Sequence, residues 1–367
     1  MSRSHANDSG KAAASRVRAD EYESDDGTAV PAMTALRSPA DHAPHYLVRA
    51  AVMAPSLYNT QPWRFVSQDG EVQLHADTSR RLPVTDPVGR ELVIGCGAAL
   101  FNMRIAMRHL GFLPRVRVFP DTAAPWHLAT VRWGPYLRPE AAEEAMYAAL
   151  TRRHTHRGPF QPDPLPVTLI RELQQHARHE GTELSPLSST EDLRRAAELI
   201  RTAEAVRRSH PAYSLELTNW TTPRGSARHD GLPSDTFPRD PDTTAFAGRD
   251  YAAHARLGYG KDISPRPARP TLGLAALLNT GQDLPEDWLR AGQGLQRVLL
   301  HAAAHHVCAA LHTQPLELPA LREQLRRTSA AGRHPQIVLR FGYVGLVRPT
   351  PRRPVREVLS RRSPLAL

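Results

Sequence analysis

The chain has 367 residues but only two cysteines, Cys96 and Cys308. Both cysteines lie far apart within apolar segments of helical spacing, a pattern that excludes a disulfide framework and a CxxC metal site. We therefore interpret them as buried thiols of a protein in a reducing compartment.

Long apolar runs are also missing. No stretch approaches the roughly 18 apolar residues that a membrane-spanning helix needs. The first residues, 1–7, lack the apolar core of a secretion signal. The sequence therefore predicts a cytoplasmic protein without a membrane partner.

Lysine is almost absent, since only Lys11 and Lys261 occur, although the net charge is +10. The excess charge is arginine, which forms forked hydrogen bonds with phosphate. A net positive charge would also be compatible with binding to nucleic acid. However, the chain has no recognised nucleic-acid-binding module and no interleaving of basic and aromatic residues. We expect a few arginines to bind a small phosphate ligand and the rest to be a solvated surface.

Motifs of nucleotide-binding folds and of hydrolases are missing too. The glycine pairs Gly95/Gly97 and Gly292/Gly294 do not complete GxGxxG, and there is no GxSxG elbow. The sequence therefore contains no Rossmann motif for binding a dinucleotide.

What the sequence does contain is a rigid loop that ends in a strand, residues 54–65. Its two prolines exclude a helix interior, and its polar side chains offer donors and acceptors at fixed positions. Such a loop suits the edge of a planar heteroaromatic ligand. The alternative is a plain turn that enters a strand.

Apolar spacing predicts a mixture of antiparallel strands and long helices, which indicates an α+β fold. We expect helices over residues 40–53, 91–110, 139–153, 190–208 and 288–311, and strands over residues 63–66, 72–76, 115–119, 126–133, 272–278 and 336–343. Setting Gly97 on Gly292 also aligns Leu100 with Leu295. This weak internal repeat would divide the chain into two related halves, although generic helix patterning gives the same matches.

Two further segments stand out in the second half. In residues 152–160, arginines alternate with a hydroxyl and present donors on one side of an extended chain, as a phosphate and a ring edge require. The alternative is a charged linker. Residues 209–270 have no clear period, so they are either disordered or a lid over a site, and their scattered aromatic residues favour the lid.

Three histidines and a cysteine fall on one stripe of the helix expected over residues 288–311: His301, His305, Cys308 and His312. HxxxH spacing occurs in zinc sites, but histidines satisfied in a core or an interface give the same pattern. We expect no metal.

Four segments together resemble the flavin-dependent nitroreductase family, and the chain is similar to its Acg-type branch over about residues 38–360. The segments are Pro55-Ser56 with Asn59-x-Gln61-Pro62-Trp63-Arg64-Phe65, Arg153-His154-Thr155-x-Arg157, Gln314-Pro315-Leu316-Glu317, and Arg352-Arg353-Pro354. The resemblance implies a nitroreductase-like α+β fold with one half over residues 38–140 and another over 141–360, the lid being an insertion at about 209–270. Residues 1–37 lie outside it and are expected to be a disordered tail.

In that family two identical subunits build each FMN site. Here the complementary motifs lie in different halves, so the resemblance implies a fused dimer with one composite FMN site. Arg153, Arg352 and Arg353 would bind the phosphate, and Arg157 would stabilise negative charge on the ring. The full set of implied cofactor-binding residues is Pro55, Ser56, Asn59, Gln61, Arg153, His154, Thr155, Arg157, Pro315, Leu316, Glu317, Arg352 and Arg353.

The resemblance implies an oxidoreductase that passes electrons from NAD(P)H through FMN to a nitroaromatic or quinone acceptor, either as an intramolecular pseudo-dimer or as a further homodimer. No side chain is expected to be catalytic, because the flavin carries the electrons. With a closed lid, neither NAD(P)H nor an acceptor would reach the flavin. The alternative is therefore an FMN storage or sequestering protein without turnover.

Overall fold

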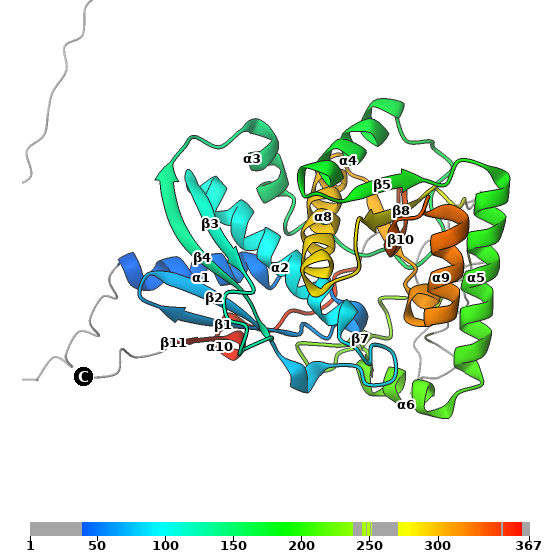
Figure 1. The fold of residues 1–367 in the computed structure, drawn as a ribbon, viewed down its shortest axis with the longest axis horizontal. Coiled ribbons are helices and arrows are strands. Elements are labelled where there is room, and N and C mark those ends of the chain that lie inside the picture. The colour runs from blue at the N-terminus through cyan, green and yellow to red at the C-terminus, as the bar shows by residue number, and fades with distance from the viewer. Residues whose placement is uncertain are drawn as a thin grey trace, which may run out of the picture. The chain divides into compact units, whose positions relative to one another are not determined.

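The computed structural model describes residues 39–237, 244–246, 248–249, 251, 271–345 and 348–361. The tail expected over residues 1–37 lies outside these ranges, as does the larger part of the expected lid after residue 237. Figure 1 shows the arrangement of the described elements.

The first half is built on a five-stranded sheet in the order β11-β1-β2-β4-β3. The strands expected over residues 63–66 and 72–76 pair antiparallel as a hairpin, which turns at Asp69 and Gly70, both with positive φ. The C-terminal strand β11 pairs in parallel with β1, so the end of the second half joins the sheet of the first. The strands are β1 (Trp63–Gln68), β2 (Glu71–Ala76), β3 (Phe112–Val118), β4 (His127–Tyr136) and β11 (Leu359–Arg361).

Helices α1 (Pro39–Ala51) and α2 (Arg90–His109) belong to this half, and α3 (Ala141–Ala148), which follows the expected boundary at residue 140, packs against α2 and against α8 of the second half. Small residues occupy positions 95–99 of α2, and the helix is buried almost all round. The short helices η1 (Leu57–Asn59) and η2 (Thr78–Arg80) also belong to it, and α10 (Val355–Val358), from the end of the second half, contacts α1 and β1.

The second half has an antiparallel sheet in the order β5-β8-β10-β9. Its strands are β5 (Glu183–Pro186), β8 (Leu274–Thr280), β9 (Cys308–Leu311) and β10 (His334–Gly342), and β6 (Thr221–Thr222) pairs separately with β7 (Leu232–Pro233). Its helices are α4 (Val167–His179), α5 (Thr190–Arg208), α6 (Pro211–Trp220), α8 (Pro285–Ala304), η3 (Gln314–Glu317) and α9 (Pro319–Ser329). Within the described ranges, no helix combines the length and the apolarity that crossing a membrane requires.

The two halves repeat one topology. The order α1, β1, β2, α2, β3, β4 recurs as α4, β5, β8, α8, β9, β10, and the strand order β1-β2-β4-β3 recurs as β5-β8-β10-β9. Helices α5 and α6 are inserted between β5 and β8, and α9 between β9 and β10. The weak internal repeat of the sequence therefore corresponds to a repeated arrangement of elements.

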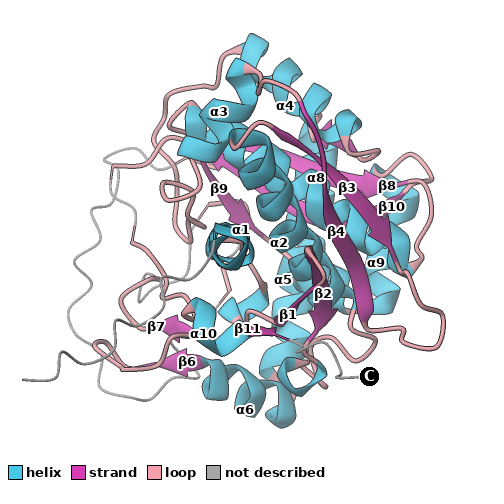
Figure 2. Ribbon diagram, turned by 90° about the vertical axis from the view of Figure 1, so that its left-hand side faces the viewer, coloured by secondary structure: helices cyan, strands magenta, loops and turns pink. Residues whose placement is uncertain are grey.

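Helices α2 and α8 pack against each other at Gly97 and Gly292. A Cβ atom on Gly97 would meet the carbonyl oxygen of Leu289 at 2.2 Å, and one on Gly292 would meet that of Ile94 at 2.0 Å. The offset that sets Gly97 on Gly292 also sets the first and last residues of α2 on those of α8. Equivalent residues that touch each other are expected where a two-fold axis passes between related helices. In Figures 1 and 2 this helix pair lies at the centre of the fold.

Two helix predictions are wrong at their C-terminal ends. The helix expected over residues 288–311 ends at Ala304, because His306 takes φ of +59° and Val307 donates its N–H back to Ala302. This Schellman-type turn directs residues 308–311 into β9. The expected stripe is therefore broken, with Cys308 and His312 outside the helix. The helix expected over residues 139–153 likewise ends at Ala148.

Candidate functional site

Arg153, Arg157 and Arg352 form a cationic cluster at the junction of the two halves. The Arg153 residue is only 3% exposed, and its Nη2 donates to the carbonyl oxygen of Met53 at 3.1 Å. Its Nε and Nη1, and the Nε of Arg352, are buried and have no hydrogen-bond partner among the described residues. Within the ranges that the structure describes, none of the three arginines pairs with a carboxylate.

Among the described residues, the positive charge of this cluster is not balanced by a carboxylate. Burial lowers the pKa of Arg352 to about 9, and the charges of Arg153 and Arg157 contribute to that shift. Burial also lowers the pKa of Arg153 to about 10. The pKa of His154 falls to about 4 through burial and the same positive charges, so its imidazole is neutral at pH 7. An anion bound here would restore the balance of charge.

Cys308 lies beside Arg153 but does not neutralise it. Both residues line one pocket, which Arg152 and His306 also border. Burial raises the pKa of the Cys308 thiol to about 11, so the sulfur is uncharged at pH 7. The cationic cluster therefore has no thiolate partner, and Cys308 is less buried than the sequence suggested.

A second pocket opens next to the cluster and is lined by both halves. The first half contributes Pro55, Ser56 and Gly95, and the second contributes Thr155 and Arg157. Leu232, Arg249 and Tyr251, which lie in the segment between β5 and β8, also line the pocket. The loop at residue 54 and the segment at residue 152 therefore border the same pocket.

The free volume of this pocket is about 80 Å³. A dry protein cavity that admits benzene measures about 150 Å³, so a larger ring needs more room than this pocket offers. Arg249 and Tyr251 are among the residues that border the pocket.

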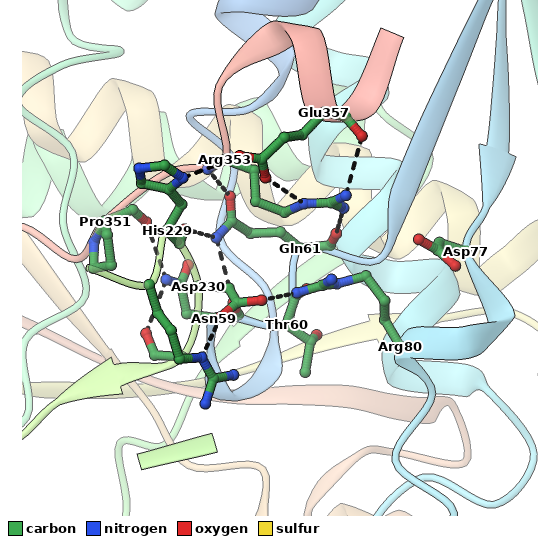
Figure 3. Close-up of polar contacts among 12 residues, drawn as sticks. Asn59, Thr60, Gln61, Asp77, Arg80, His229, Asp230, Pro351, Arg353 and Glu357 are labelled. Carbon is green, nitrogen blue, oxygen red and sulfur yellow. Dashed lines mark hydrogen bonds and ion pairs between the residues drawn. The ribbon is translucent and has the colours of Figure 1, made fainter. Parts of the chain in front are cut away.

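Asn59 and Gln61 hold the loop rather than face this pocket (Figure 3). Gln61 is fully buried; its Nε2 donates to the carbonyl oxygen of His229 at 2.8 Å, and its Oε1 accepts the N–H of Arg353 at 2.8 Å. The Nδ2 of Asn59 donates to the carbonyl oxygens of Gly231 and Pro351. These bonds join the loop to segments of the second half.

The adjacent arginines Arg352 and Arg353 have different surroundings. Arg352 donates to Oδ1 of Asn59 at 3.2 Å, and its nearest charges are arginines. Arg353 instead contacts the carbonyl oxygen of Gln61 at 3.4 Å and lies 3.6 Å from the carboxylate of Glu357. Figure 3 shows Arg353 between Gln61 and Glu357. The structure therefore brings Arg352, but not Arg353, into the cationic cluster.

Pro315, Leu316 and Glu317 form the short helix η3 and do not line the pocket. The N–H groups of Leu316 and Glu317 both donate to the carbonyl oxygen of Thr313, which itself borders the pocket. The Glu317 carboxylate pairs with Arg207 and with Arg249, the latter at 2.7 Å.

Sequence reasoning missed a buried polar network above the pocket. The hydroxyl groups of Tyr58 and Tyr213 lie 2.6 Å apart, and Arg249 donates to both of them and to Glu317. Burial raises the pKa of Tyr58 well above its usual value, so this hydroxyl stays protonated. Tyr213 was among the aromatic residues of the expected lid, but no pattern distinguished Arg249 from the other arginines.

Comparison with known proteins gives several relatives, although no family model matches the sequence. The chain is 33% identical over 316 residues to a Mycobacterium tuberculosis protein named "Putative NAD(P)H nitroreductase", a match that covers 84% of this chain and 88% of the relative. It is 29% identical over 327 residues to the protein named "Putative NAD(P)H nitroreductase acg" of the same organism, covering 86% and 95%.

The solved structures that match parts of the chain include two nitroreductases. The FMN-dependent nitroreductase NfnB from Mycobacterium smegmatis, in complex with NADPH, is 19% identical and covers 60% of this chain and 99% of its own, with a TM-score of 0.36. An FMN-bound nitroreductase from Desulfitobacterium hafniense is 12% identical and covers 60% and 98%, with a TM-score of 0.37.

Proposed function

Because this chain belongs to the Acg-type nitroreductase family, we propose that it binds one FMN between its halves and acts as an NAD(P)H-dependent oxidoreductase. The observation that carries the proposal is the cationic cluster, in which Arg153 and Arg352 keep buried N–H groups without a partner. A phosphate dianion supplies both the missing charge and the missing acceptors. The donor set therefore fits the phosphate of FMN.

Each residue of the junction has a separate part in holding the cofactor. Arg153 and Arg352 would bind the phosphate, and neutral His154 beside them would donate or accept a hydrogen bond without adding charge. Asn59 orients Arg352 through its Oδ1. Gln61, with Arg353 behind it, keeps the loop in the conformation that presents Ser56 to the pocket.

The ring of the cofactor would lie in the pocket shared by Ser56, Gly95, Thr155 and Arg157. Bound FMN would supply electron transfer from NAD(P)H to an acceptor, which we propose is a nitroaromatic or a quinone. Arg157 has no carboxylate partner among the described residues, so its charge is available to stabilise negative charge on the ring edge.

We further propose that the two halves correspond to the two subunits of the family's dimer. The repeated element order, the Gly97–Gly292 contact and the contribution of each half to one pocket support this proposal. The phosphate-binding arginines belong only to the second half, and the Pro55-Ser56 loop only to the first. One FMN per chain is therefore expected.

A second function, storage of FMN without turnover, is favoured by the small volume of the pocket. Arg249 is fixed by Tyr58, Tyr213 and Glu317, and its side chain borders the space that the ring would need. If this arrangement persists above the bound flavin, reductant and acceptor are both excluded.

The visible spectrum of the purified protein tests both functions. A flavin spectrum with about one FMN per chain, bleached by anaerobic NADPH or NADH, supports the oxidoreductase. A flavin spectrum that neither nucleotide bleaches supports storage. A colourless protein that does not take up added FMN refutes the cofactor assignment.

A further inference from the structure

A cluster of histidines lies where α4 meets the end of α8, apart from the residues assigned to FMN. Glu172 belongs to α4, His301 to the last turn of α8, and His305 caps that helix. Each of the three residues offers one ligand atom, and these three atoms all lie within 4.8 Å of one another. The Oε2 atom of Glu172 is 3.0 Å from Nε2 of His301 and 4.0 Å from Nε2 of His305.

The backbone places these three residues together in a defined way. His301 and His305 are four residues apart, so they share a helix face, and the chain leaves the helix only at His306. Glu172 is held against that face because α4 packs on α8 through an apolar core that includes Leu173 and Leu299. The packing of α4 on α8 therefore places the three ligand residues close together.

The charges around Glu172 suit a cation. Within the described residues, the ion-pair partners of Glu172 are the two imidazoles. Arg297 is engaged elsewhere, since it pairs with Glu180 at 3.0 Å and donates to Nδ1 of His176 at 3.1 Å. The carboxylate is therefore balanced only by histidines, which are uncharged whenever they act as metal ligands.

We propose that Glu172, His301 and His305 bind one Zn²⁺ ion. Imidazole nitrogen and carboxylate oxygen are zinc ligands at about 2.0–2.2 Å, and tetrahedral coordination at that length separates ligand atoms by about 3.3–3.6 Å. The observed separations bracket this value. Side chains of Glu172 and His305 are about half exposed, so small rotations bring all three onto one ion, and water takes the fourth position.

His176 supports the site without joining it. Its ring centroid lies 4.0 Å from that of His301, and its Nδ1 accepts from Arg297, which fixes the orientation of the ring. His176 therefore packs against a ligand and limits its movement. Such contacts around a metal ligand keep it in a binding geometry.

The zinc ion would join α4 to the turn that leads into β9. That turn matters for the proposed FMN site, because Ala309 of β9 accepts the N–H of His156 at 2.8 Å. The ion would thus stiffen the edge against which the phosphate-binding segment lies. Binding of the zinc ion should therefore raise the stability of the folded chain, which can be measured in the absence of flavin.

The test uses the untagged full chain, stripped of metal by a chelator and titrated with ZnCl₂ in competition with a chromophoric zinc indicator. We expect one Zn²⁺ per chain and a higher unfolding temperature with zinc than without it. His305→Ala and Glu172→Gln should each weaken binding by about tenfold or more, because removing even a group that only orients a ligand costs about 10–100-fold.

The matched control is His109→Ala. His109 lies 2.7 Å from Glu144, a histidine–carboxylate pair that is in no three-ligand group among the described residues. Zinc affinity should be unchanged in this variant. Circular dichroism of His305→Ala checks its fold, which is expected to be native because the side chain is half exposed.

Substitution with Co²⁺ gives an independent readout. The wild-type protein should show the visible d–d bands of tetrahedral cobalt, and His305→Ala should lose them. Equal zinc affinity in the wild type and in His305→Ala would overturn the proposal. So would zinc binding that leaves the unfolding temperature unchanged.

Discussion

The guanidinium of Arg153 lies close enough to that of Arg352 for its charge to lower the pKa of Arg352. Both groups also have a buried nitrogen without a hydrogen-bond partner. Two like charges in a buried site raise the free energy of the ligand-free fold, and a bound anion removes that penalty. The arrangement therefore favours binding at the expense of stability.

Replacing both arginines should abolish retention of FMN. In Arg153→Ala with Arg352→Ala, the phosphate loses its two buried cations, each worth about 1.5–3 kcal/mol as a charged hydrogen bond. Flavin content after gel filtration, read from the visible spectrum, measures the effect. Arg353→Ala is the matched control, because its charge faces Glu357 and should leave most of the flavin bound. A double variant with full flavin content would show that the phosphate binds elsewhere.

The same electrostatics predict a gain in stability when one charge is removed. Arg153→Met keeps much of the buried volume and removes an uncompensated cation, so the flavin-free protein should become more stable by about 1–3 kcal/mol. Urea unfolding of the flavin-free proteins gives this difference. Inorganic phosphate should stabilise the wild type and have less effect on the variant. A less stable variant would mean that the bond to Met53 outweighs the repulsion.

The sequence predicted the α+β class and most central elements because their apolar patterns are long and regular. It missed α4, β5, α6, β9 and α9. It also extended α8 to residue 311, although the helix ends at Ala304, because His306 takes a left-handed conformation that usually requires glycine. No local pattern signals that choice.

The candidate site was predictable to the extent that its residues belong to short local motifs. The loop of Pro55 and the segment of Thr155 do meet at one pocket. The placement of Arg352 was not predictable, because its charged neighbours Arg153 and Arg157 come close only in the folded chain, whereas Arg353 pairs locally with Glu357, four residues further on.

The contact between α2 and α8 predicts a large loss of stability in Gly292→Ala. The new methyl carbon would lie 2.0 Å from the carbonyl oxygen of Ile94, so the helices must separate, at a cost of about 3 kcal/mol. Thermal and urea unfolding measure the change. Gly281→Ala is the control, since its Cβ would meet no atom within 4 Å. Equal stability of the two variants would contradict the close packing of the halves.

Arg249 should control entry into the pocket. In Arg249→Ala the side chain that borders the pocket is shortened, while Glu317 keeps its ion pair with Arg207, so the fold should survive. We expect the flavin-free protein to take up FMN severalfold faster, followed as quenching of flavin fluorescence in a stopped-flow experiment. If the oxidoreductase proposal holds, bleaching by NADPH should also become faster.

Arg228→Ala provides the comparison, because Arg228 pairs with Asp230 and does not line the pocket. Identical rates in the two variants would show that access is limited by another segment, and the small volume of the pocket would then no longer favour storage over turnover.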